Sequence, residues 1–534
     1  MSLRLSGEKL KVTKLNNLHQ NHEISETCYK HYPENRKLEP SDRAYAKEML
    51  GLDANRKKLQ QKLMKKTGKF ISNRDLSNIS QTNRNSSTRN DLDATIEMLR
   101  TEYHCTVDVC SDAEKNFAGF FIQDDDMRKV FQAYPEIIFL DATYKLLEIQ
   151  TPLYILAAED SDGSTEVCGV AILAVETKET IEWMIEAFKK RNPSWEKVRV
   201  VMADKDVNER DIIKTCLPQA ALLICLFHTL RTFRRELTTD KVNISIGTRQ
   251  VLLELVEAMA YSRTLGDYVK SKNLFLASAS DEAKTYFLEN WDNIREEWVM
   301  CDKFGVGNFL NNTNNRLECI NSKLKDVVKL YSSLEELFQQ LFVTLSNLRG
   351  AVDHKAKMCV QRRKLSHNSL PEHIRMYTEH LTPYATKHVL PQIDIAVSTN
   401  YIFYENGNDS YQVQTSNGIA TLTATKCSCS FSLAMNLPCR HIFALRAIKS
   451  MPLFDATLCA ERWTASYYRS TQRSFLQSRQ PTPTTSTASI GITQLPSSQP
   501  LTHNRKYRVA NEVTRKIADV TAFTCGDVFD HRLS

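Results

Sequence analysis

The sequence lacks long apolar runs and a secretory leader pattern, and each absence excludes a class of protein. No apolar run approaches the ~18 residues that a membrane-spanning helix needs, and the opening MSLRLSGEKL contains no apolar core of a signal peptide. The 14 cysteines are therefore expected to be reduced, and close pairs are interpreted as metal ligands before disulfides. We expect no membrane partner.

The chain also has little net charge, and that charge lies at one end. The total is +7 over 534 residues, whereas residues 1–70 alone contain 16 Lys and Arg against 8 Asp and Glu. Basic charge on one module is typical of a phosphate-binding surface, although a solvated helical face would look the same. At ~150 residues per domain, the length predicts three or four domains.

Residues 41–91 are predicted to form a basic helical DNA-docking region followed by a linker. A helix over 43–69 ends in NRKKLQQKLMKKTGK, and a short turn and second helix follow over 71–79. The Ser/Asn/Arg-rich residues 80–91 are the linker. The candidate DNA-binding residues, which could equally be a nuclear localisation signal, are Arg56, Lys57, Lys58, Lys62, Lys65, Lys66 and Lys69.

Residues 92–360 alternate between helix and strand patterns. Three apolar, β-branched runs at 136–144, 152–160 and 166–176 have strand length, and Asp162–Gly163 predicts a hairpin turn. Helix, strand (198–204), helix, strand (221–227) and helix follow. This order predicts an α/β fold with an RNase H-like core, in which 244–310, lacking strand signals, form a helical insertion.

Three carboxylates are the candidate catalytic residues: Asp141 ends the first core strand, Asp204 ends the fourth, and Glu318 lies on a later helix. In an RNase H-like fold these elements are neighbours, so the carboxylates should lie within ~8 Å of one another and bind Mg²⁺ or Mn²⁺. Two such ions could activate a water or 3′-hydroxyl for phosphodiester chemistry. Without metal, repulsion should raise at least one pKa.

Each carboxylate also has an ordinary structural interpretation. An aspartate at a strand end commonly caps a turn, and Glu318, three residues after Asn315, could complete a capping box. Asp206 could replace Asp204 as a ligand, although the strand register favours Asp204.

The C-terminal half contains a pattern of soft metal ligands: Cys427-x-Cys429, nine residues, then Cys439-x-His441. Four Cys and His ligands predict a closed, structural zinc site. Short strands before it and a helix at 439–450 predict a small ββα-type finger over 395–465.

Four motifs, FLDATYK, MADKD, ICLFHTL and TNNRLECINSKLK, resemble in their order the signature blocks of Mutator-like (MULE) DDE transposases across roughly residues 70–350. The resemblance implies that Asp141, Asp204 and Glu318 are the catalytic acids. Cys225 and His228 match the family's C-x-x-H element, which either packs the core or binds metal. Ala203 departs from the family, where many members have Thr.

The C-x-C…C-x-H pattern resembles the SWIM zinc finger, and RWT at 462–464 resembles the segment that often follows it. The whole chain is similar to transposase-derived SWIM zinc-finger proteins. Residues 1–40 resemble the remnant of a FAR1/FLYWCH-like finger, but no cysteine precedes Cys28, so His19 and His22 are not expected to hold zinc. Residues 477–503 are expected to be a disordered linker and 504–534 a C-terminal helix.

Together with these patterns, the two resemblances imply a transposase-derived, zinc-binding nuclear protein that binds DNA or chromatin partners through a retained DDE scaffold. The intact acids favour an alternative, an active metal-dependent DNA transposase or nuclease, whereas the incomplete N-terminal finger favours binding alone. A third possibility is a protein-interaction adaptor that uses the SWIM finger and the helical insertion. Zinc would be structural, and Mg²⁺ or Mn²⁺ would be needed only for catalysis.

Overall fold

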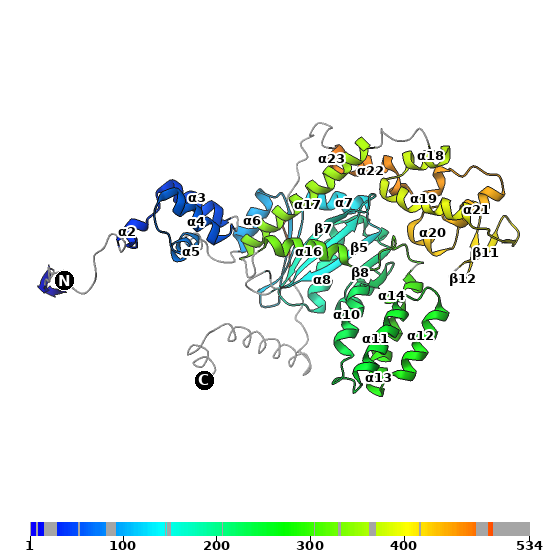
Figure 1. Cartoon of the computed structure of the whole chain (residues 1–534), viewed down its shortest axis with the longest axis horizontal. Coiled ribbons are helices and arrows are strands. Elements are labelled where there is room, and N and C mark those ends of the chain that lie inside the picture. The colour runs from blue at the N-terminus through cyan, green and yellow to red at the C-terminus, as the bar shows by residue number, and fades with distance from the viewer. Residues whose placement is uncertain are drawn as a thin grey trace. The chain divides into compact units, whose positions relative to one another are not determined.

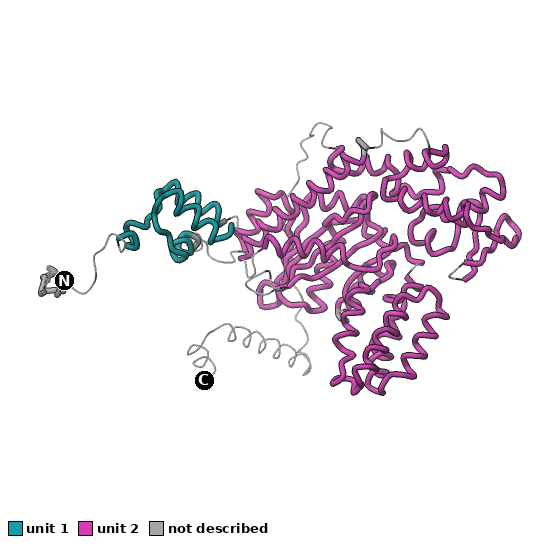
Figure 2. The backbone as a smooth tube through the Cα atoms, in the orientation of Figure 1, with its two compact units in different colours: residues 1–91 teal, residues 92–534 magenta. Residues whose placement is uncertain are grey.

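The computed structural model describes two compact units, residues 1–91 and 92–534 (Figure 2). Among the described residues, no helix combines the length and apolarity that crossing a membrane requires. The described ranges are 2–6, 9–14, 29–51, 54–81, 92–144, 146, 151–205, 207–303, 305–328, 333–362, 370–415, 418–476 and 490–494.

The first unit contains an antiparallel hairpin, β1 (Ser2–Ser6) and β2 (Lys9–Lys14), followed by short helices. The sequence patterns did not predict this hairpin within residues 1–40, while His19, His22 and Cys28 lie outside the described residues. The helix expected over 43–69 is two helices. The helices in the described part of this unit are α2 (Pro33–Arg36), α3 (Pro40–Gly51), α4 (Arg56–Thr67) and α5 (Asn73–Gln81).

Helix α4 has clear local signals at both ends. The Asn55 side chain accepts a hydrogen bond from the Lys58 amide at 3.1 Å, and Gly68 ends the helix in the left-handed conformation with φ of 68°. Leu59 and Leu63 are the buried positions of α4, and they join a small core with residues of α3 and α5. The helix therefore buries one apolar face and leaves its basic face to solvent.

The second unit is built on an eight-stranded sheet of order β13-β3-β4-β7-β6-β5-β8-β9. The five neighbouring strands β7-β6-β5-β8-β9 confirm the RNase H-like order. Strands β5, β6 and β7 are antiparallel to their neighbours among themselves, whereas β8 and β9 run parallel to β5. The strands are β3 (Thr106–Ser111), β4 (Phe117–Gln123), β5 (Ile137–Thr143), β6 (Leu153–Glu159), β7 (Thr165–Leu173), β8 (Val200–Ala203), β9 (Ala221–Ile224) and β13 (Ile490–Gln494).

Three strands of this sheet were not predicted from the sequence. Strands β3 and β4 form an antiparallel hairpin that extends the sheet beyond β7, and β13 pairs in parallel with β3. The expectation of a disordered linker over 477–503 is wrong for the residues of β13, because their backbone pairs with the sheet. The rest of that linker and the predicted helix over 504–534 lie outside the described residues.

Side chains alternate between the two faces of the sheet, and helices cover both. Phe139 and Ile155 pack with α6, α16 and α17, whereas the adjacent Leu140 and Leu156 pack with α8 and α9. Figure 1 shows the helices α6, α8, α16 and α17 around the strands of this sheet. The core helices are α6 (Leu92–Thr101), α7 (Asp125–Ala133), α8 (Lys178–Arg191), η1 (Pro193–Lys197), α9 (Val207–Cys216), α10 (Leu226–Glu236), α16 (Asn315–Val327) and α17 (Leu334–Arg362).

The predicted insertion over 244–310 is helical, and together with α10 it forms a separate hydrophobic core around Phe233, Trp291 and Trp298. Three contacts among the described residues join it to the end of β8 and the helix that follows: Lys205 Nζ lies 3.7 Å from the Trp291 ring centroid, and Glu297 pairs with Arg210 at 2.7 Å and with Lys214 at 2.6 Å. Its helices are α11 (Ile246–Ala260), α12 (Leu265–Ser278), α13 (Asp281–Asn290), η2 (Asp292–Ile294), α14 (Arg295–Trp298) and α15 (Met300–Lys303).

The described residues of the C-terminal module, 395–465, form three strands, two α-helices (α20 and α21) and two short 3-10 helices, where a ββα finger was expected. Helices α18 and α19 precede it, and α22 and α23 return to the core. The elements are α18 (Glu372–His380), α19 (Pro383–Ser398), β10 (Phe403–Glu405), β11 (Tyr411–Thr415), β12 (Gly418–Leu422), α20 (Ser430–Met435), α21 (Arg440–Ile448), η3 (Ala456–Leu458), η4 (Glu461–Trp463), α22 (Ala465–Thr471) and α23 (Arg473–Leu476).

Candidate functional site

Four buried side chains meet in the C-terminal module: Cys427, Cys429, Cys439 and His441, with ligand atoms that all lie within 4.8 Å of one another. Nδ1 of His441 lies 3.8 Å from Sγ of Cys427 and 3.7 Å from Sγ of Cys439. A tetrahedral Zn²⁺ with Zn–S bonds of ~2.3 Å places its ligand atoms about 3.5–3.8 Å apart. The predicted residues therefore fit zinc, and four protein ligands make the site structural.

Local backbone features bring these ligands together. Cys427 bridges back to Leu422 at the end of β12, and Cys429 is the N-cap residue of α20. Asn436 ends α20 in the left-handed conformation with φ of 52°, and the chain then turns so that Cys439 caps α21. His441 consequently lies in the first turn of α21, directly opposite the two cysteines from the strand.

Hydrogen bonds among the thiols of the zinc site shift their pKa values. Hydrogen bonds from the Cys427 and Cys439 thiols lower the pKa of Cys429, whereas the hydrogen bond to Cys429 raises the pKa of Cys427 to about 12. Burial raises the pKa of Cys439. Since zinc binds thiolates, metal binding should release protons and depend on pH.

The last residues of the C-terminal module, which contains the zinc site, anchor this zinc module to the core. Arg462 pairs with Glu136 at 2.6 Å and donates to the Glu159 carbonyl at 2.6 Å. Trp463 is fully buried, donates its indole N–H to the Met435 carbonyl at 2.6 Å, and packs edge-on against Phe309. The RWT motif is therefore a strut that ties α20 and the sheet to one hydrophobic core.

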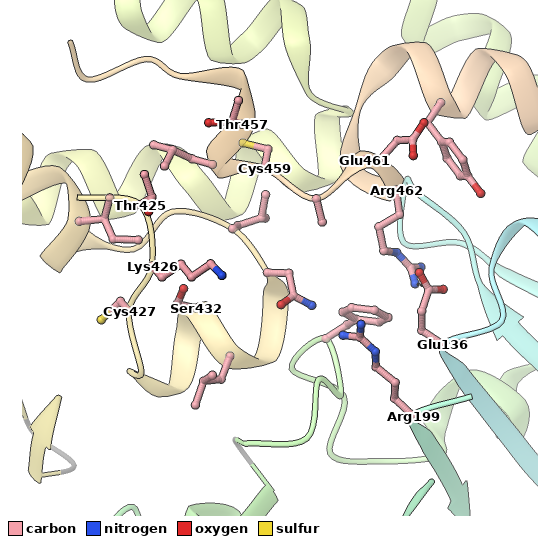
Figure 3. A pocket seen from close by; sticks show the side chains of 18 residues that line it. Glu136, Arg199, Thr425, Lys426, Cys427, Ser432, Thr457, Cys459, Glu461 and Arg462 are labelled. Atoms are coloured by element: carbon pink, nitrogen blue, oxygen red, sulfur yellow. Dashed lines mark hydrogen bonds and ion pairs between the residues drawn. The ribbon is translucent and has the colours of Figure 1, made fainter. Parts of the chain in front are cut away.

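A cavity of about 590 Å³ separates the zinc module from the core beside this strut. Lys426 extends into it from the zinc-module side, whereas Glu136, Arg199 and Arg462 lie on the core side (Figure 3). Glu136 and Arg199 immediately precede β5 and β8, so the cavity lies at the beginnings of the two strands whose ends carry Asp141 and Asp204. The cavity is thus distinct from the place where these two carboxylates lie.

The acidic site lies at the carboxyl ends of β5 and β8, which are parallel neighbours. Ile137 pairs with Val200 and Phe139 with Met202, so the same register continues to Asp141 and Asp204. The alternation along both strands directs these two side chains to the face that α16 covers. Asp206 lies outside the described residues, so its possible role as a ligand stays open.

His228 connects Asp204 to Glu318. Its Nδ1 contacts Oδ1 of Asp204, and its Nε2 lies 3.0 Å from Oε1 of Glu318. The hydrogen bond with Asp204 is the main cause that raises the pKa of His228 to about 10. Glu318 therefore faces the aspartate-bearing strand ends, and the imidazole stands between two of the three predicted acids.

The start of α10 holds His228 in this position. Cys225 is fully buried and its sulfur accepts a hydrogen bond from the Asn314 amide at 3.0 Å, while the Leu226 amide donates to the Asn312 carbonyl at 3.0 Å. The C-x-x-H element was predicted either to pack the core or to bind metal, and Cys225 packs in the core. His228 instead belongs to the acidic site.

Asp141 is buried, and α16 supplies its partner. The Asn321 amide donates to Oδ2 of Asp141 at 2.6 Å. Burial, followed by the charge of Asp204, raises the pKa of Asp141 to about 7, as expected for carboxylates packed together. Oδ1 of Asn321 is buried without a hydrogen-bond partner. Carboxylates beside an orphaned amide oxygen fit a hard divalent cation, so Mg²⁺ or Mn²⁺ would suit this site.

The acidic site is looser than the zinc site. Within the described part of the chain, only the Cys₃His group brings its ligand atoms within 4.8 Å of one another. Sequence reasoning missed Asn321, although it stands within the motif TNNRLECINSKLK and three residues after Glu318. That spacing places both side chains on one face of a helix, which could have indicated it.

The fold and its two sites define the class of the protein: an RNase H-like α/β protein with a helical insertion and a Cys₃His site of the zinc type. Residues 96–223 match the family model of the RNaseH-like domain of zinc finger SWIM domain-containing protein 1/3. The match covers the segment from α6 to β9, with Asp141 and Asp204, and ends before His228 and Glu318. Over these residues, which include most strands of the central sheet, the chain is thus similar to a SWIM-containing, transposase-derived family.

Proposed function

We propose that this chain is a transposase-derived, zinc-containing nuclear protein that binds DNA, with the basic face of α4 as a main contact. The observation that carries the proposal is the exposure of that face: the side chains of Arg56, Lys57, Lys58, Lys62, Lys65 and Lys66 are exposed beside buried Leu59 and Leu63. Basic side chains gathered on one exposed helix supply non-specific affinity for DNA phosphates.

The seven predicted cations are not equivalent. Lys66 pairs with Asp42 at 2.7 Å, Lys69 pairs with Glu39 at 3.2 Å, and Lys62 donates to the Tyr45 hydroxyl. Within the described residues of the unit, the other four cations, Arg56, Lys57, Lys58 and Lys65, form no such pair. We therefore expect most of the phosphate contacts from Arg56, Lys57, Lys58 and Lys65.

The test measures DNA affinity of the full chain against salt concentration. Changing these four residues to Gln should reduce the slope of log affinity against log salt by about 3–4, since each phosphate contact contributes ~0.9. A control of the same charge changes cations of the insertion region: Lys241, Arg263, Lys270 and Lys284. Equal slopes for the two variants would refute the contact surface, and imaging the first variant in cells tests its role in nuclear localisation.

A second function is favoured by the convergence of Asp141, His228, Asp204 and Glu318: metal-dependent cleavage or joining of DNA strands, as the resemblance to Mutator-like transposases suggests. The bound cation would activate a water or 3′-hydroxyl. Nicking of supercoiled DNA with Mg²⁺ or Mn²⁺, lost in Asp141→Asn, would support it. Equal activity of the two proteins would point to a contaminating nuclease.

A further inference from the structure

We propose that the acidic site takes one divalent cation, held by Asp141, Asn321 and Asp204, and that His228 closes the second position between Asp204 and Glu318. The inference rests on the proposed second function, because it assumes that the acids are a metal site. It goes further by naming an amide ligand and by replacing the expected pair of ions with a single one.

The first observation concerns Asn321. Its Nδ2 donates to Oδ2 of Asp141 at 2.6 Å, which fixes the orientation of the amide, because a carboxylate accepts hydrogen bonds and does not donate them. Its Oδ1 is therefore the atom of the amide that Asp141 does not use, and this buried oxygen has no donor. An amide oxygen is a ligand that hard divalent cations accept together with carboxylates. Asn321 thus offers an oxygen beside Asp141 that no protein group uses.

The second observation concerns His228. Two ions ~4 Å apart would need carboxylates that reach both of them. Here Oδ1 of Asp204 and Oε1 of Glu318 contact opposite nitrogens of one imidazole ring. An ion between Asp204 and Glu318 would have to displace that ring, which the anchored start of α10 holds in place. The second ion position is therefore filled by the protein itself.

The experiment counts Mn²⁺ ions on the zinc-loaded full chain, by calorimetry and by the paramagnetic resonance signal of free Mn²⁺. The wild-type chain should bind one ion at the acidic site. Asn321→Ala should weaken that binding at least tenfold, whereas Asn290→Ala, which removes an amide from the end of α13, should leave it unchanged. His228→Ala should admit a second ion.

Asn321→Asp separates a ligand from a residue that only positions Asp141. This variant keeps an oxygen for the cation but loses the N–H group that donates to Asp141. Retained Mn²⁺ binding in Asn321→Asp supports ligation, and a loss equal to that of Asn321→Ala overturns it. Thermal melting verifies that each variant is folded, and His228→Gln serves in place of His228→Ala if the latter does not fold.

Three other results overturn the proposal: two ions on the wild-type chain, unchanged affinity in Asn321→Ala, or a single ion in the folded His228 variants. Absence of Mn²⁺ binding in the wild type overturns both this inference and the catalytic function. DNA binding through α4 is measured separately by its salt dependence, so its failure is recognised independently.

Discussion

The zinc site and the acidic site are built in opposite ways. The zinc ligands come from one short stretch, residues 427–441, and the four protein ligands close the site. The acidic site draws Asp141, Asp204 and Glu318 from separate elements, and its side chains have spare oxygens. The zinc site is formed by neighbouring residues and stabilises the fold of its own module. The acidic site forms only after the strands and helices of the core have packed together.

The two sites should therefore have opposite effects on stability. Metal bound by four protein ligands contributes folding free energy directly. A buried carboxylate that lies near a second one costs free energy until a cation neutralises it: burial, followed by the charge of Asp204, raises the pKa of Asp141. Variants that remove a ligand from each site make this contrast measurable.

The largest effect is expected from Cys439→Ser. Structural zinc in isolated fingers is worth ~10–16 kcal/mol, so the variant should lose its zinc and the order of the C-terminal module. Because Met435, Phe443 and Trp463 belong to the same hydrophobic core as β5 and β6, the RNase H-like core should also melt at a lower temperature. Metal analysis and thermal melting measure both effects.

Cys459→Ser is the matched control for that variant. Cys459 is also buried near the zinc module, but it is not one of the four ligands. It should retain one zinc per chain. If Cys439→Ser still binds zinc as tightly as this control, the assignment of the site is wrong.

A smaller effect is expected from Trp463→Ala, which removes the strut but no ligand. Loss of a fully buried Trp costs about 3–5 kcal/mol, and the indole hydrogen bond to Met435 is lost as well. The variant should keep its zinc while its melting temperature falls. Loss of zinc together with stability would mean that the strut and the metal site cannot be separated.

The smallest effect, with the opposite sign, is expected from Asp141→Asn. The folded pKa of Asp141 is raised from 3.8 to about 7, so its charge destabilises the fold increasingly as pH rises between these values. The amide removes this penalty: without divalent metal the variant should equal the wild type near pH 4 and gain up to about 4 kcal/mol by pH 8. Denaturant unfolding across pH measures the difference.

Asp281→Asn is the control, since the Asp281 side chain is 95% exposed. It should follow the wild type at every pH. A wild-type stability that rises relative to Asp141→Asn between pH 5 and 8 would contradict the buried, repelled state of Asp141.

The sequence predicted the parts of this molecule that local patterns specify. Apolar runs located β5 to β9, and the Asp162–Gly163 turn appears as predicted, with Gly163 at φ of 70°. Strands β3 and β4 were missed because they precede the strand that carries Asp141 and lack an Asn-Gly or Asp-Gly turn between them. Strand β13 was missed because its pairing with β3 joins residues far apart in sequence within a polar stretch.

The same distinction holds for the sites. The zinc ligands follow from spacing alone, whereas convergence of the acids required a fold to be inferred first. The position of His228 between Asp204 and Glu318 depends on how α10 meets α16, a contact through Cys225 and Asn314 that no local pattern encodes. Arg462 was recognised as part of a motif, but its ion pair with Glu136 needs the whole intervening chain.

The strut has a consequence for the order of folding. The core begins at residue 92 of the sequence. Its contacts around Glu136, Phe309 and Met435 are completed only by Arg462 and Trp463. During synthesis, the side of the sheet near Glu136 therefore stays incomplete until some 300 later residues have been added. Translation adds about 5–20 residues per second. A nascent chain would expose this apolar surface throughout that interval, so shielding of the unfinished protein should matter most before its zinc module emerges.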